Sequence, residues 1–136
     1  MMASTHALKA AAKSVTAGLL TLVAVPAVAA GLDFATAKRL ADAAHDDAYA
    51  QRWTDANNSQ HLDEKDNCYF KSPGPLRQVL VIDTAGEVTG VIADRNNAKA
   101  ACFRGSYLHA HFPPPPSAPY YQYLFMADPQ APADPR

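Results

Sequence analysis

The chain has 136 residues, of which 49% are apolar, and its formal net charge is −1. This length suits one domain of ordinary size. The near balance of charge excludes both the basic surface typical of nucleic-acid-binding proteins and a long acidic tail, so we expect no nucleic-acid partner.

Residues 1–29 have the layout of a secretory signal peptide. Lys9 and Lys13 precede an uncharged run of small and apolar residues, which ends in Ala27-Val28-Ala29, an A-x-A cleavage pattern. The alternative is a membrane anchor, but an anchor needs about 20 apolar residues and this run is shorter. We therefore expect cleavage after Ala29 or Ala30, export to the periplasm or secretion, and no stable membrane insertion after cleavage.

Cys68 and Cys102 are the two cysteines of the chain, and both lie in the part expected to be exported. An oxidising compartment favours a disulfide between them. The alternatives are a catalytic thiol, which would need an activating base, and a metal site, which would need more ligands. The bridge would close a loop of roughly 35 residues and stabilise the domain by on the order of 3–4 kcal/mol in the loop-entropy model.

The N-terminal part of the exported chain, residues 30–66, is expected to contain one helix and a polar loop. Apolar spacings of three and four predict an amphipathic helix from about Asp33 to Trp53. The expected apolar side consists of Ala37, Leu40, Ala41, Ala44 and Ala48, extended by Tyr49 and Trp53. Polar and turn-forming residues then predict a loop over 54–67.

A β-hairpin is the clearest element of the expected α+β domain, residues 67–127. Val79 to Ile82 and Val88 to Ala93 are rich in β-branched residues, and they flank a turn that contains Gly86. A helix is expected next, over 98–112, ended by the four prolines that begin at Pro113. Its expected packing side consists of Ala98, Ala101, Cys102, Gly105, Leu108 and Phe112.

The sequence APYYQYLFMA predicts a third strand, which returns to the sheet after the helix has crossed it. Tyr121, Tyr123 and Phe125 should face one side of the sheet. Tyr120, Gln122, Leu124 and Met126 should face the other. The tail, 128–136, is rich in proline and is expected to be disordered. The fold class is therefore α+β, with a small antiparallel three-stranded sheet, a crossing helix, an extra N-terminal helix and one disulfide.

The apolar hairpin, the glycine turn, the helix leading into FPPP and the closing aromatic strand together resemble the TonB C-terminal domain superfamily. The pair Cys68-Tyr69, with Cys102 ahead of Phe112, resembles most the cysteine-containing C-terminal domain of the AgmX/PglI type. The resemblance covers about residues 68–126. It implies a non-catalytic periplasmic interaction module that binds an envelope or periplasmic protein, with strand addition at a sheet edge as one binding mode.

The aromatic third strand is the candidate partner-binding edge. The residues in question are Tyr120, Tyr121, Gln122, Tyr123 and Phe125. They offer more aromatic surface than a two-layer fold must bury on both faces. The alternative is that this surface is buried internally, under the crossing helix and against the N-terminal helix.

His109 and His111 form a candidate metal site. Two histidines at this spacing can bind copper or nickel if the backbone is extended there, although exposed histidines at a helix end would also explain them. No nucleophile-elbow, zinc-protease or phosphate-loop motif occurs, so we expect neither an enzyme nor a cofactor. Two alternative functions stay open, a secreted inhibitor or immunity protein of an enzyme, and a small periplasmic copper-binding protein.

Overall fold

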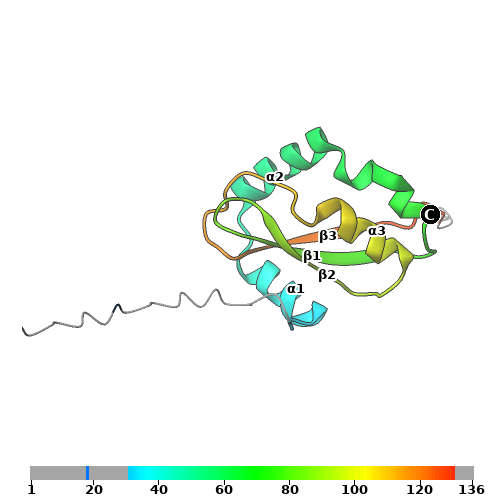
Figure 1. Cartoon of the computed structure of the whole chain (residues 1–136), viewed down its shortest axis with the longest axis horizontal. Helices are drawn as coiled ribbons and strands as arrows, with labels where there is room; N and C mark the ends of the chain where they lie inside the picture. Colours follow the sequence, from blue (N-terminus) through cyan, green and yellow to red (C-terminus); the bar gives the residue numbers. More distant parts are fainter. Residues whose placement is uncertain (1–17, 19–30, 131–136) are drawn as a thin grey trace, which may run out of the picture.

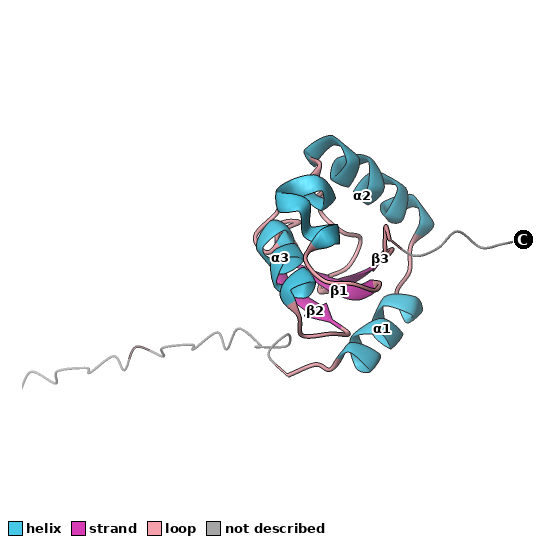
Figure 2. Cartoon of the chain, turned by 90° about the vertical axis from the view of Figure 1, so that its right-hand side faces the viewer, coloured by secondary structure: helices cyan, strands magenta, loops and turns pink. Residues whose placement is uncertain are grey.

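A computed structural model describes residue 18 and residues 31–130 of the chain. The expected signal peptide, apart from Gly18, and the end of the expected tail lie outside the described residues. The described part is a three-layer α+β domain (Figure 1). One helix covers one face of a small sheet, and the remaining helices cover the other (Figure 2).

The sheet has three antiparallel strands in the order β2-β1-β3, as the sequence predicted in outline. The strands are β1 (Leu76–Ile82), β2 (Val88–Ala93) and β3 (Tyr120–Met126). The predicted hairpin is confirmed, and β1 begins earlier than the apolar run Val79–Ile82 suggested. Since β1 pairs with both neighbours, β2 and β3 are the two edge strands.

The single N-terminal helix predicted from Asp33 to Trp53 is wrong, because the chain forms two helices there. They are α1 (Phe34–Ala43) and α2 (Asp47–Gln60). Asp33 caps the first, with its carboxylate accepting from Thr36 N–H at 2.7 Å. The second starts afresh at Asp46, whose carboxylate accepts from Tyr49 N–H at 2.7 Å. An aspartate in this position satisfies the unpaired N–H groups of a new first turn.

The two helices lie on opposite faces of the sheet. Ala37 and Ala41 of α1 pack against Val79, Val81 and Tyr121. In α2, Tyr49 and Trp53 instead enter the larger core on the other face. The apolar positions predicted to form one continuous side therefore belong to two separate cores.

The predicted loop over 54–67 is also wrong, because most of this segment is helical. Helix α2 continues to Gln60, and His61 then adopts a left-handed conformation with a φ of 52°. A 3₁₀ segment, η1 (Leu62–Phe70), follows, with non-helical residues inside it. Its buried residues, Leu62 and Cys68, join the larger core. The residue types did not predict these helical turns, because few side chains of the segment are buried and the rest are polar.

The crossing helix α3 (Ala98–Tyr107) ends before the prolines, so the prediction that they terminate it is wrong. Leu108 already has extended backbone. The next residues pair with the start of β2, where His109 N–H donates to Val88 C=O and Val88 N–H donates to Ala110 C=O, both at 2.9 Å. These hydrogen bonds compensate for those that a longer helix would have made.

The predicted packing side of this segment is wrong in part, because Ala98, Ala101 and Gly105 are exposed. Cys102 and Leu108 do pack against the larger core, and Phe112 is buried in it. The main contacts of α3 come from other residues. Its buried residues are Lys99, Ala100, Phe103 and Tyr107. The two aromatic rings bury far more apolar surface than the small residues of the predicted side could. Lys99 is fully buried, and its Nζ donates to the carbonyl of Gly74 at 2.6 Å.

Cys68 and Cys102 form the predicted disulfide, with Cα atoms 5.4 Å apart. The bridge joins η1 to α3 on the face of the sheet that carries the larger core. It therefore ties the crossing helix to the segment that leads into β1.

Candidate functional site

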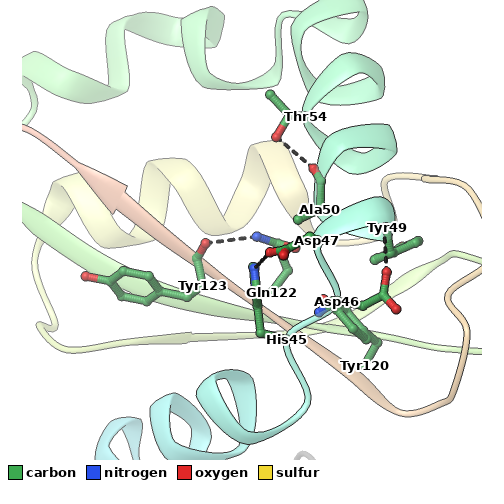
Figure 3. Close-up of polar contacts among 9 residues, drawn as sticks. All are labelled: His45, Asp46, Asp47, Tyr49, Ala50, Thr54, Tyr120, Gln122 and Tyr123. Atoms are coloured by element: carbon green, nitrogen blue, oxygen red, sulfur yellow. Dashed lines mark hydrogen bonds and ion pairs between the residues drawn. The ribbon is translucent and has the colours of Figure 1, made fainter.

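The N-terminal half of the predicted binding edge on β3 is occupied by contacts within the domain. Tyr120 is buried, and its ring packs edge-on against Tyr49 with 4.6 Å between the ring centroids. The Tyr120 hydroxyl accepts a hydrogen bond from Asp46 N–H at 3.3 Å. The connection from α1 to α2 thus passes beside the start of β3 (Figure 3). Tyr121 is buried against α1 on the opposite face.

The ladder geometry decides which backbone groups of the edge strands face outward. Asp94 N–H donates to Arg77 C=O at 2.9 Å, so Arg77 turns its backbone toward β2. Backbone groups alternate in direction along an antiparallel strand, and alternate residues of β1 therefore bond to β2 and to β3. The partners of Gln78 and Leu80 on β3 are Leu124 and Gln122. Those β3 residues bond inward, so Tyr121, Tyr123 and Phe125 present their backbone groups at the outer edge.

The C-terminal half of β3 is the open part of this edge. Phe125 is 58% exposed, and Tyr123 is half-buried with Lys38 Nζ 4.5 Å from its ring centroid. The side chain of Gln122 donates from Nε2 to the Tyr123 carbonyl at 3.1 Å (Figure 3). One outward carbonyl is therefore already engaged, and the open stretch is short.

The outer edge of β2 was not recognised as a site from the sequence. The segment after α3 covers the beginning of this edge. It hydrogen-bonds to Val88, and Phe112 N–H donates to the carbonyl of Gly86, in the turn before β2, at 2.8 Å. Further along, the β1 register pairs Val79 with Ile92 and Leu80 with Val91. By the same alternation, Ile92 bonds inward, and Val91 and Ala93 turn their N–H and C=O groups outward.

A groove runs along this open part of β2. Two adjoining hollows, of about 370 Å³ and about 540 Å³, share Val91, Ala93 and Arg104 in their walls. Leu32 contributes to one hollow, and Arg95, Ala100 and Ala101 contribute to the other. The small side chains on α3 leave room beside the strand.

Charge in the groove is predominantly positive. Asp94 is held by Arg77, with a 3.0 Å contact between the Arg77 Nε and the Asp94 carboxylate. Arg95 and Arg104 are exposed and form no ion pair within the described part of the chain. Two guanidinium groups with no ion-pair partner among residues 31–130 therefore line a strand edge, and the nearby carboxylate of Asp94 is already paired.

Both histidines of the predicted pair contact Glu87, one through its side chain and the other through its backbone. His109 has a φ of 68°, and its Nδ1 lies 3.0 Å from a carboxylate oxygen of Glu87. His111 forms an isolated bridge with Glu87 through the backbone. Among residues 31–130, no group of three or more His, Cys, Asp or Glu side chains is arranged to hold a metal ion.

The carboxylates on the hairpin have structural partners. Asp83 accepts from the N–H groups of Ala85 and Glu87, at 3.0 and 2.9 Å, and so closes the turn. A hydrogen bond from the backbone N–H of Thr36 lowers the pKa of Asp33. The other groups with a shifted pKa are tyrosines in the larger core or packed against it. Burial raises the pKa of Tyr49 to about 12, and burial also raises the pKa of Tyr69 and Tyr107. None of these three residues lines the groove beside β2.

Comparisons with protein-family models, with curated proteins and with solved structures return no match to this chain. Within the described residues, no helix has both the length and the hydropathy needed to cross a bilayer. The open strand edges and the groove therefore stand as the features from which function must be inferred.

Proposed function

We propose that this chain is an exported, non-catalytic protein-interaction module of the TonB-like kind, which binds a periplasmic or envelope partner by strand addition. The observation that carries the proposal is the pair of short, open strand edges, at Val91–Ala93 and at Tyr123–Phe125. Unpaired N–H and C=O groups in a row are a template for another strand, and proteins usually cover or disrupt them. An added strand gains backbone hydrogen bonds there and side-chain contacts on both faces.

Export is supported by the layout of residues 1–30 and by the disulfide, because structural disulfides persist in oxidising compartments. The domain is small, so one covalent bridge can supply a substantial share of its stability. The inhibitor and copper-binding alternatives stay predictions, and no feature of the described residues favours either over strand addition.

Site-specific photo-crosslinking in cells that export the protein tests this proposal. A benzophenone amino acid would replace Phe125 at the β3 edge or Thr89 beside the β2 edge. The control is Asn58, which is exposed and belongs to α2 rather than to either edge strand. We expect one or more defined protein adducts from an edge position and none from Asn58. Equal adducts from all three positions, or adducts from Asn58 alone, would contradict strand addition.

A further inference from the structure

We infer that the outer edge of β2 docks an extended acidic segment of the partner, with Arg95 and Arg104 binding its carboxylates. This inference rests on the proposed function, since it names the edge and the chemistry of the added strand. It goes beyond the β3 edge that the sequence suggested, and it assigns a role to the groove between β2 and α3.

The backbone of β2 supplies the first part of the argument. Val91 and Ala93 turn N–H and C=O groups outward, and both residues line the groove. The pairing of Val88 with His109 and Ala110 closes the strand at one end. An incoming strand therefore has a defined register, because it must begin beyond Val88 and can bond only where Val91 and Ala93 are open.

The walls of the groove supply the second part. Residues of α3 stand on one side of the strand edge, and Leu32, which packs with the α1 core, stands on the other. Side chains of an added strand point alternately to the two faces of the sheet. Those on the α3 side would meet Ala100, Ala101 and Arg104, where small residues leave space and the guanidinium offers a charged partner.

The charges decide the chemistry of the occupant. Arg guanidinium groups form paired hydrogen bonds with carboxylates, and Arg95 and Arg104 make no ion pair within the described residues. A second copy of the chain, docked by its own β2 edge, would bring two further arginines into the same interface. Like charges brought close together destabilise pairing. An acidic segment of another protein fits the groove better than a second copy.

The β3 edge differs in ways that suit it less to such a segment. Its exposed side chains are aromatic, and Lys38 there is already paired with Asp42. One of its outward carbonyls accepts from Gln122. The charge complementarity therefore favours β2 over β3 for an acidic strand.

The test is an NMR titration of the full oxidised chain, as purified, with a short capped peptide in which valine alternates with glutamate. The control peptide has lysine in place of glutamate. We expect the glutamate peptide to shift the amide signals of Val91 and Ala93, and the lysine peptide to bind at least about tenfold more weakly. Arg95→Gln and Arg104→Gln should each lower affinity roughly threefold, and the double variant about tenfold.

A matched pair of proline variants separates the two edges. Ala93→Pro removes an outward N–H from β2, and Phe125→Pro removes one from β3. Neither N–H pairs with β1 in the ladder, so both prolines occupy positions that edge strands tolerate. We expect Ala93→Pro to lower peptide affinity by at least about tenfold and Phe125→Pro to leave it unchanged. If Ala93→Pro does not fold, the two arginine variants still decide the question.

Four results would overturn the inference. Equal binding of the glutamate and lysine peptides at β2 would show that the edge does not select an acidic segment. Binding that shifts only the β3 amides would show that the peptide binds at the other edge. A dimer of the free chain formed through β2, seen by sedimentation, would make the occupant a second copy. The second of these leaves strand addition intact. Absence of peptide binding at both edges also overturns the inference, and the crosslinks from Phe125 and Thr89 then decide the proposed function independently.

Discussion

Gly86 in the hairpin turn lies against Phe112, which donates its N–H to the Gly86 carbonyl at 2.8 Å. Gly86 has a φ of +87°, and a Cβ atom built on it would collide with the carbonyl oxygen of Phe112. The contact joins the turn of the hairpin to the chain just before the proline run. It fixes the segment that leads from α3 to β3 against the hairpin. The part of the β2 edge that this segment covers begins at the same point.

Gly86→Ala is expected to lower the free energy of unfolding by about 3 kcal/mol or more, because it combines a left-handed backbone with a backbone clash. The matched control is Gly105→Ala in α3, where no heavy atom lies within 4 Å of the built Cβ. That change should raise the free energy of unfolding by about 0.5–1 kcal/mol. Urea unfolding of both variants measures the difference. Equal stabilities would show that the turn does not pack against Phe112.

Removal of the disulfide should destabilise the domain without changing its fold. For the double variant Cys68→Ser, Cys102→Ser, we expect a loss of about 3 kcal/mol, because the unfolded chain regains the freedom of the closed loop. Thermal unfolding under non-reducing conditions measures this. A reducing agent should lower the Tm of the wild type toward that of the variant and should leave the variant unchanged. A wild-type Tm that does not respond to reduction would contradict a bridge that contributes to stability.

Gln78 on the central strand is fully buried, and among the residues that the structure describes neither its amide nitrogen nor its amide oxygen has a hydrogen-bond partner. A methionine of similar shape would remove that desolvation cost, so Gln78→Met should raise the free energy of unfolding by about 1 kcal/mol. The control is Gln51→Met on the exposed side of α2, which should change stability by less than about 0.5 kcal/mol. Calorimetry of both variants measures this. A loss of stability in Gln78→Met would mean that the Gln78 amide makes a stabilising interaction in the folded protein, which contradicts the expected desolvation cost.

Alkaline pH should unfold the protein through its buried tyrosines. Burial raises the pKa of Tyr49 from its ordinary value of 10.0 to about 12, and its hydroxyl donates to the Pro113 carbonyl at 2.8 Å. Because the pKa in the folded state lies above that in the unfolded state, this contribution to stability is complete below pH 10 and is lost as the pH rises through about 12. Tyr69 and Tyr107 contribute in the same direction.

Measurement of the unfolding free energy against pH checks this expectation. In Tyr49→Phe, the decline above pH 10 should become shallower, while stability at neutral pH should fall by about 1 kcal/mol through loss of the hydrogen bond to Pro113. Tyr123→Phe at the partly exposed edge is the control and should keep the wild-type slope. A wild-type stability that is constant across this range would contradict burial of these hydroxyl groups.

Local sequence patterns predicted the sheet well and the helices less well. The β-branched runs and Gly86 identified the hairpin because strand alternation and turn chemistry are local properties. The helix predicted from Asp33 to Trp53 was wrong because the alanine spacing continues through a point where Asp46 starts a new helix. Asp46 is a residue type that can begin a helix, so the sequence does contain a marker for the start of α2. Apolar periodicity alone does not show that the chain passes from one face of the sheet to the other at this point.

The candidate site was harder to predict because edge status depends on strand order. The aromatic residues of β3 drew attention as a binding surface, yet Tyr120 and Tyr121 are buried in the two separate cores. Val91 and Ala93 look like ordinary strand residues in the sequence. Their outward backbone groups become apparent only once β1 is known to lie in the centre. Similarly, Lys99 was not expected in the core because its hydrogen bond to Gly74 depends on the tertiary fold.

Intact mass of the protein recovered from the periplasm or the culture medium, alkylated after denaturation with and without prior reduction, tests most directly whether this is an exported, disulfide-bridged domain. We predict a chain that begins at Ala30 or Gly31, takes up no alkylating agent before reduction, and takes it up at both Cys68 and Cys102 afterwards. A chain that retains residues 1–29 and carries two free thiols would contradict export, the disulfide and the proposed extracytoplasmic partner together.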